Sequence, residues 1–269
     1  MPEKYVRRDG LPILVRHTGR TTLPQNPPAL GDGPTVVCLH DAGLQSSVFG
    51  ELLTASAPKG DAIAFDLPGH GRSGSLDSLP TIKKMAELAK WVADWSGASN
   101  PVLVGHGMGA LIALEWAKNA SVAGLVLCGA GLALETNDDA IEYMREVTRG
   151  KAPRPFDPKR VCPDGGRAMM QKAYMEGIKT DPRATLVDLE ASQTWSKAFD
   201  PEGIDCPATI VIGASENTDC VARAQTLAGQ LSSGRTATVE AAAHFLPLEQ
   251  PAALAALIAA EIKRVAEAA

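Results

Sequence analysis

A sharp turn in the middle of the chain has the pattern of a catalytic site but lacks a catalytic side chain. Residues 102–113 read VLVGHGMGALIA: a short apolar run, a glycine-rich turn and a helix-forming run. Such a strand–turn–helix segment is the setting of a nucleophile elbow, which exposes the side chain at its centre for attack on a substrate. The central residue here is Gly107. The turn therefore has the shape for nucleophilic catalysis and no nucleophile.

The other glycines of this turn fit its geometry. A strand that ends at Gly105 must turn sharply into a helix that begins near Met108, and Gly105 and Gly109 leave room for neighbouring elements to approach closely. The first backbone N–H groups of the helix point to one spot, which suits a developing negative charge. The sequence thus predicts an anion-stabilising site beside Gly107.

His244 is the best candidate for proton transfer among the five histidines of the chain. It follows the last predicted strand, and the pKa range of histidine makes it a natural proton acceptor near neutral pH. A catalytic histidine needs a partner that holds its tautomer. The segment IVIGASENTDCV offers Glu216 and Asp219, although either carboxylate could instead cap the helix that begins near residue 220.

Short apolar runs alternate with helical patterns, which favours a mostly parallel sheet covered on both faces, an α/β fold. The predicted strands are residues 13–17, 35–39, 62–65, 101–104, 122–128, 208–212 and 236–240. The predicted helices are residues 46–57, 82–95, 108–119, 220–231 and 251–268.

The alternation breaks between about residues 134 and 205, a segment rich in proline. Helical patterns occur at 138–149 and 167–178 within it. Because long segments in compact domains are usually functional, we interpret 135–205 as a lid over a pocket and 1–134 with 206–269 as the core. The alternative is a plain surface excursion, which would cost little in stability.

Composition excludes several classes of function. A net charge of −5 offers no surface for nucleic acid. The sequence shows no signal peptide and no apolar run that would span a bilayer, so we expect a cytoplasmic protein without a membrane partner. The five cysteines are scattered and lack metal-ligand spacing, which indicates reduced thiols and predicts no metal and no cofactor. The oligomeric state is not predicted.

Four segments together resemble the α/β-hydrolase family. They are VVCLHDAGLQSSVF (36–49), FDLPGHGRS (65–73), VLVGHGMGALIALEWA (102–117) and AHFLPLEQP (243–251), and they occur in the order of the family's oxyanion loop, strand-four turn, nucleophile elbow and histidine loop. The resemblance covers nearly the whole chain. It implies an α/β-hydrolase fold with about eight mostly parallel strands, helices on both faces and a small lid after strand six.

The resemblance also assigns roles to residues. It implies an oxyanion hole formed by the backbone N–H groups of Ala42 and Met108, and His244 as the general base. It favours Glu216, three residues past a strand-ending glycine, as the orienting acid, with Asp219 in reserve. His40 and His106 lie inside family turns, where they would shape the loops that border the substrate pocket. The lid methionines, Met169 and Met170 among them, are candidates to line that pocket because methionine adapts its shape.

Three hypotheses explain Gly107, where the family has Ser, Cys or Asp. The protein is a serine hydrolase inactivated by glycine, an enzyme that uses His244 as a general base without a covalent intermediate, or a ligand-binding protein that lost its reaction. The second is favoured by Asp41, which stands where glycine commonly follows the histidine of the oxyanion loop. A carboxylate pointing inward there would disfavour an oxyanion and could move protons. The alternative is that Asp41 points to solvent or caps the following turn.

We therefore predict an enzyme that acts on a small, largely apolar ester, lactone or activated ketone through His244, without an acyl-enzyme. A small-molecule substrate would bind between the lid and the carboxyl ends of the strands. Lyase, decarboxylase or cyclase chemistry remains an alternative to hydrolysis.

Overall fold

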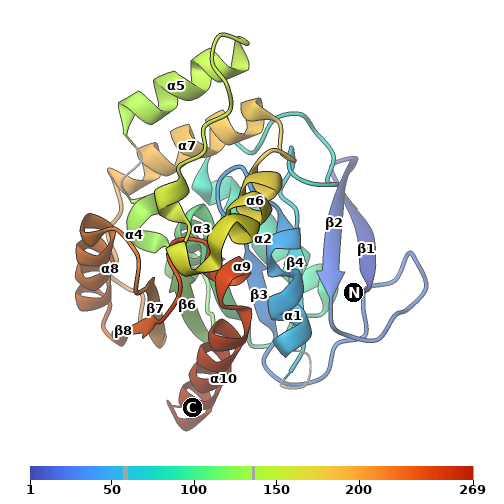
Figure 1. Cartoon of the computed structure of the whole chain (residues 1–269). Helices are drawn as coiled ribbons and strands as arrows, with labels where there is room; N and C mark the ends of the chain where they lie inside the picture. Colours follow the sequence, from blue (N-terminus) through green and yellow to red (C-terminus); the bar gives the residue numbers. More distant parts are fainter. Residues whose placement is uncertain (57–59, 135–136, 269) are drawn as a thin grey trace.

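An eight-stranded sheet with the order β1-β2-β4-β3-β5-β6-β7-β8 forms the centre of the molecule (Figure 1). The computed structural model describes residues 1–56, 60–134 and 137–268. The strands are β1 (Glu3–Arg8), β2 (Leu11–His17), β3 (Val36–Leu39), β4 (Ala62–Phe65), β5 (Val102–His106), β6 (Gly124–Cys128), β7 (Ala208–Gly213) and β8 (Gly234–Val239). Strands β3 to β8 pair in parallel, whereas β1 with β2 and β2 with β4 pair antiparallel. The predicted mostly parallel sheet is confirmed.

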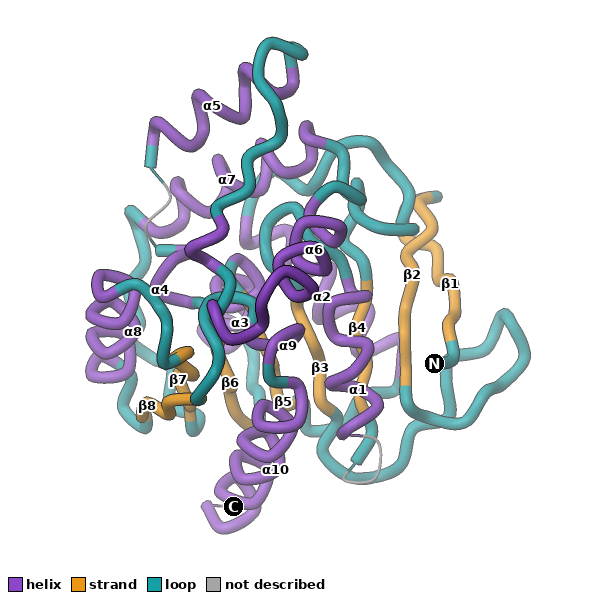
Figure 2. Tube along the Cα trace, viewed as in Figure 1, coloured by secondary structure: helices purple, strands orange, loops and turns teal. Residues whose placement is uncertain are grey.

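Helices cover both faces of this sheet (Figures 1 and 2). α2 (Ile82–Ser96), α3 (Met108–Asn119) and α8 (Thr218–Gln230) pack on one face, and α1 (Gly50–Ser56) and α10 (Pro251–Ala268) pack on the other. Alternate residues of a strand point to opposite faces. Leu103 of β5 accordingly joins the first apolar cluster, while Val104 joins the second. No helix in the described ranges is both long and apolar enough to cross a membrane.

The boundaries of most elements lie within two residues of the predicted ones, with informative exceptions. β1 was not predicted, because its sequence EKYVRR carries charges on an antiparallel edge strand and lacks an apolar run. The predicted helix 46–57 is divided into a 3₁₀ helix, η1 (Ser46–Phe49), and α1. Residue 57 of that prediction lies outside the described residues.

The long connection between β6 and β7 contains α4 (Ala130–Ala133), α5 (Asp138–Thr148), the 3₁₀ helices η3 (Pro158–Arg160) and η4 (Pro163–Gly165), α6 (Gly166–Gly177) and α7 (Pro182–Ser196). In Figure 1, α5 and α7 lie above the upper edge of the sheet. α7 was not predicted because Pro182 reads as a break, whereas it occupies the first turn of a helix capped by Asp181. Residues 135–136 of the predicted lid lie outside the described residues.

A buried ion pair fixes α7 to the core. Asp188 of α7 accepts a hydrogen bond from Nε2 of His70 at 2.8 Å and another from the backbone N–H of Gly43 at 3.0 Å. Both side chains of the pair are fully buried. Burial opposes protonation of His70, but the charge and hydrogen bond of Asp188 outweigh it and raise the pKa of His70. The connection between β6 and β7 is thus tied to two loops of the core, one of which is the loop that contains Asp41.

Candidate active site

The loops at the carboxyl ends of the parallel strands bring four predicted residues to one place. Asp41 follows β3, Gly107 follows β5, Glu216 follows β7, and His244 lies between β8 and the short helix α9 (Leu246–Glu249). Because parallel strands all end at the same edge of a sheet, residues far apart in sequence meet there. This edge is the one over which α5, α6 and α7 are placed (Figure 1).

Gly107 has the backbone conformation of a strained elbow, and the space where its side chain would lie is occupied. Its φ of 53° and ψ of −118° lie in a region that residues with a side chain rarely adopt. A Cβ atom built on Gly107 would overlap the carboxylate of Asp41, and one built on the neighbouring Gly109 would overlap the carbonyl oxygen of Leu39. Both glycines are therefore required by close approach, and the place of the elbow side chain is taken by Asp41.

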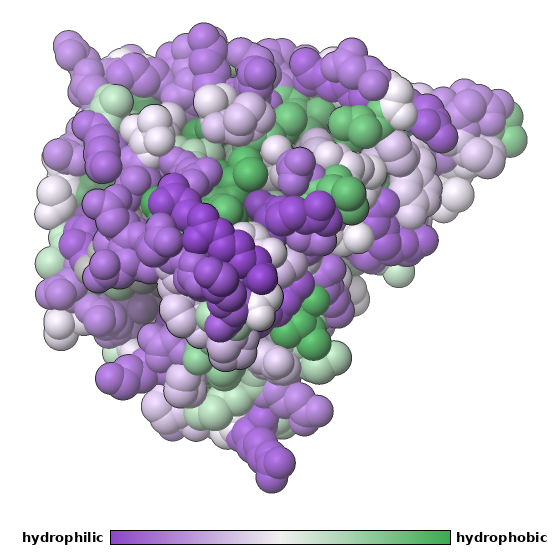
Figure 3. Space-filling view, turned by 90° about the horizontal axis from the view of Figure 1, so that it is seen from above, coloured by the Kyte–Doolittle hydropathy of each residue, from purple (hydrophilic) through white to green (hydrophobic). Residues whose placement is uncertain are grey.

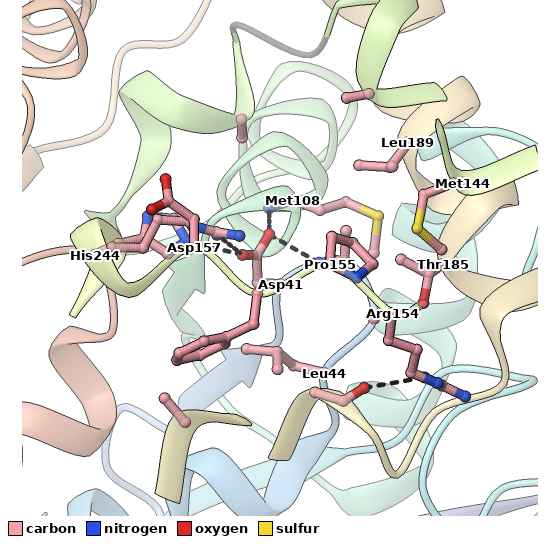
Figure 4. Close-up of a pocket in the computed structure, with 18 of the residues that line it drawn as sticks. Asp41, Leu44, Met108, Met144, Arg154, Pro155, Asp157, Thr185, Leu189 and His244 are labelled. Carbon is pink, nitrogen blue, oxygen red and sulfur yellow. Dashed lines mark hydrogen bonds and ion pairs between the residues drawn. The ribbon is translucent and has the colours of Figure 1, made fainter. Parts of the chain in front are cut away.

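The Asp41 carboxylate makes four polar contacts in this position (Figure 4). Its Oδ1 accepts hydrogen bonds from the backbone N–H groups of Ala42 and Met108, both at 2.8 Å. Its Oδ2 lies 2.9 Å from Nε2 of His244 and 3.2 Å from Nη2 of Arg160. The two N–H donors expected to form the oxyanion hole thus bind a carboxylate of the protein itself. The inward orientation proposed for Asp41 as one alternative is the observed one.

The charges of this pair follow from its surroundings. Burial disfavours the charged form of Asp41, but the hydrogen bond and charge of His244 together with Arg160 outweigh burial and hold the pKa of Asp41 well below its ordinary range. Burial and the Arg160 charge lower the pKa of His244 to about 3, although Asp41 opposes this shift. At neutral pH Asp41 is therefore ionised and His244 neutral. The imidazole then carries its proton on Nε2 and donates it to Asp41.

Glu216 is the carboxylate nearest the other ring nitrogen. Its Oε2 lies 3.8 Å from Nδ1 of His244, which is too long for a hydrogen bond, and that buried Nδ1 has no other partner among the described residues. Burial raises the pKa of Glu216. Asp219, the reserve acid, lies exposed in the first turn of α8, where the side chain of Asn217 caps its backbone N–H at 2.8 Å. The geometry favours Glu216 over Asp219.

His40 and His106 are buried behind the site and do not line the cavity described below, contrary to the prediction. Nε2 of His40 accepts the backbone N–H of Leu67 at 3.1 Å, and its Nδ1 faces the carbonyl oxygen of Asp41 at 2.9 Å. Burial, followed by the nearby His70, lowers the pKa of His40 to about 4. Nε2 of His106 is 2.9 Å from the carbonyl oxygen of His244. Both rings therefore hold loops rather than face a substrate.

Arg160 is a residue of the site that the sequence reading missed. It ends η3 in the excursion, and besides its contact with Asp41 its backbone oxygen accepts the N–H of His244 at 3.1 Å. Its guanidinium lies over the ring of Phe245, 5.3 Å from the centroid. No local sequence pattern marks a lone arginine in a proline-rich loop, so only the folded chain reveals this contact.

A cavity of about 620 Å³ opens beside Asp41 and His244. Its lining is mainly apolar and comes from the core loops and from α5, α6 and α7 (Figure 4). Tyr143, Tyr174 and Met175 are exposed on these helices. Figure 3, which views the molecule from this side, shows apolar side chains among the polar ones near the middle of the face. A cavity of this size suits a small, largely apolar molecule.

Two of the predicted pocket residues lie elsewhere. Met169 and Met170 pack, partly buried, against the apolar cluster between the sheet and the helices α1 and α10. The methionines that line the cavity are Met108 and Met144. Met169 and Met170 of α6 therefore serve packing. The sequence pattern alone could not distinguish methionines that pack in the core from methionines that line the cavity.

Asp41, His106 and His244 place potential ligand atoms within 4.8 Å of one another, the spacing of a metal site. The donor set does not fit a cation well, however. Oδ1 of Asp41 is held by two N–H groups, and its Oδ2 faces the positive charge of Arg160. These contacts of Asp41 therefore disfavour a metal at this position.

Comparison with known proteins supports the resemblance. The sequence profile described as "Alpha/beta hydrolase family" matches residues 36–257. The chain is 38% identical over 91 residues to a pimeloyl-[acyl-carrier protein] methyl ester esterase from Chromobacterium violaceum, which covers 33% of each protein. The segments matched in two curated relatives span only 41% and 33% of their lengths.

Solved structures match over almost the whole chain. An esterase from Thermogutta terrifontis superimposes with a TM-score of 0.80 at 18% identity, covering 98% of this chain and 99% of that one. An esterase from Exiguobacterium antarcticum gives a TM-score of 0.78 at 19% identity, covering 97% and 99%. At these identities the similarity establishes the fold, and the fold prediction is confirmed.

Proposed function

The chain belongs to the alpha/beta hydrolase family, a family of enzymes, and from this premise we propose that it converts a small, largely apolar ester, lactone or activated ketone by proton transfer at His244. No acyl-enzyme forms on the elbow in this proposal, because Gly107 has no group to acylate. The observation that carries it is the Asp41 carboxylate, which fills the place of the elbow side chain and lies 2.9 Å from His244.

The pair of side chains suits a base that accepts one proton. A water that enters between Oδ2 of Asp41 and Nε2 of His244 would donate a hydrogen bond to each, whereas an enolisable substrate would present its acidic C–H to Nε2 alone. The ring would then hold its own proton on Nδ1, toward Glu216, and take the substrate proton on Nε2. The imidazolium that forms would lie between two carboxylates, which stabilise its charge.

Asp41 also limits the chemistry. In the resting site its Oδ1 already occupies the two N–H donors that would stabilise a tetrahedral oxyanion. Hydrolysis of an ester would require Asp41 to leave these donors, whereas removal of a proton from an activated ketone would not. This occupation favours the lyase and cyclase alternatives more than the sequence alone did.

The disabled serine hydrolase is less well supported. A side chain at position 107 would overlap Asp41, so the two residues are adapted to each other. A simple replacement of serine by glycine does not account for a carboxylate that fills the vacated place.

Turnover by His244 variants tests the proposal. The wild type is assayed on panels of aryl esters, lactones and β-diketones, and His244→Ala is expected to lose about 10²–10⁴-fold of any activity found. Glu216→Gln should lower the rate, and Asp219→Asn is its matched control because this exposed carboxylate, three residues further along the chain in the first turn of α8, should leave the rate unchanged. Intact-protein mass during turnover should show no adduct. Binding without turnover would favour the hypothesis of a ligand-binding protein that lost its reaction, and an acyl adduct would overturn the mechanism.

A further inference from the structure

One end of the cavity carries a positive charge that the proposed reaction does not use. Arg154 lines the cavity at the opposite end from His244 (Figure 4). The side chains of Leu44, Met108 and Pro155 lie between the two ends (Figure 4). Arg154 is therefore separated from Asp41, Asp157 and His244 along the length of the cavity.

The positive charge near His244, that of Arg160, is paired. Asp41 is paired with Arg160 at 3.2 Å and hydrogen-bonded to His244. Asp157, the other acidic residue of the lining, lies on the His244 side (Figure 4) and caps the backbone N–H of Lys159 at 2.9 Å. The Arg154 end has no acidic residue in its lining among the described residues.

The guanidinium of Arg154 is only partly engaged. Its Nη1 donates to the carbonyl oxygens of Gly177 and Thr180, at the end of α6. Within the described residues, Nη2 and Nε of Arg154 have no protein acceptor. Neither nitrogen is one of the buried atoms that lack a partner, so both remain accessible. The nearby Asp181, which interacts electrostatically with Arg154, is itself held by two hydrogen bonds from the side chain of Arg183.

We propose that Arg154 binds a carboxylate on the substrate, so that the substrate is an amphipathic acid with its reactive carbonyl at the far end. The proposal rests on the proposed function for the position of the reaction and adds the substrate class. A guanidinium presents its free N–H groups in a planar fork that matches a carboxylate. Capping of α6 uses one nitrogen alone, and it accounts for neither the free donors nor their place in the cavity lining.

Equilibrium binding tests this inference without requiring turnover. Octanoate, 1-octanol and octyl phosphate are straight-chain compounds of equal carbon number that differ in their polar group, and their affinities are measured by calorimetry with the full-length protein. The wild type should bind octanoate at least about tenfold more tightly than 1-octanol, as expected for hydrogen bonds to a charged group. Arg154→Met should lose this preference. Arg154→Gln, which retains a donor for the end of α6, should lose it as well and remain folded.

The controls separate this inference from the proposed function. Arg167→Met removes an exposed cation from α6, the helix whose end Arg154 contacts, and should retain the preference for octanoate. His244→Ala should also retain it, since it alters only the reacting end. A wild type that does not prefer octanoate, or an Arg154→Gln protein that still does, would overturn the inference. Tighter binding of octyl phosphate than of octanoate would overturn the assignment to a carboxylate.

Discussion

A serine introduced at the elbow should not act as a nucleophile unless Asp41 is also removed. In Gly107→Ser, the new Cβ would overlap the Asp41 carboxylate and force it from the backbone N–H groups of Ala42 and Met108. The positive φ of residue 107 adds strain, because a residue with a side chain rarely adopts it.

The size of the effect follows from these contacts. A hydrogen bond to a charged group contributes about 1.5–3 kcal/mol, and two are lost. Strain at such a backbone conformation costs about 1–3 kcal/mol. The low ends of these ranges together predict that Gly107→Ser lowers the free energy of unfolding by about 4 kcal/mol. Such a loss is a large fraction of the stability of a typical domain.

The double variant Asp41→Gly/Gly107→Ser removes the overlap and frees the two N–H donors. Glycine is the residue that commonly occupies position 41 in the family. We expect the double variant to be more stable than Gly107→Ser and to gain a burst of p-nitrophenol from p-nitrophenyl butyrate, since the serine would face His244 and an open oxyanion hole.

Chemical denaturation and stopped-flow absorbance measure both quantities, with Asp41→Gly as the reference. A burst from Gly107→Ser alone, at wild-type stability, would refute the reasoning. It would mean that Asp41 does not occupy the place of the elbow side chain.

Three further predictions concern the charges around the site. The pKa of Asp41 is held below its ordinary 3.8, so its contribution to stability is present above that pH and is lost as the pH falls through the lower native pKa. The stability difference between wild type and Asp41→Asn should stay constant from about pH 8 to 5 and shrink only in acid, as urea denaturation would reveal. The pKa of His70 is raised from 6.5, so its pairing with Asp188 stabilises most below pH 6.5 and is lost as the pH rises through the native pKa. Wild type and His70→Gln should therefore converge in stability at high pH, and a constant difference would contradict the pairing. Glu249 accepts the N–H groups of Cys162 and Ala243, so Glu249→Gln should lower activity and increase hydrogen exchange at residue 243, while unchanged exchange would argue against this role.

The elements of the core could be predicted because local patterns specify them. The apolar run 102–104 and the glycine-rich turn located β5 and the start of α3 at Met108, where the structure has it. β1 could not be predicted, because an edge strand that pairs only with β2 needs no continuous apolar run. α7 was missed because Pro182 begins a helix as readily as it ends one.

The site was predictable only in part, for a physical reason. Sequence motifs place backbone at the ends of strands, so Gly107 and His244 could be expected near each other. The direction of a side chain depends on the space around it. Asp41 turns inward because Gly107 leaves a volume there and two N–H donors face it. Arg160 arrives from a loop whose path no local pattern specifies.

The contact between Asp41 and His244 is the central claim, and the protonation of the His244 ring tests it most directly. The chain has five histidines, so long-range ¹H–¹⁵N correlation spectra can be assigned with single histidine variants. At pH 7 the wild type should show a neutral His244 protonated on Nε2, and Asp41→Gly should shift that proton or shift the tautomer toward Nδ1. A His244 spectrum that is the same in both proteins would contradict the contact and the mechanism built on it.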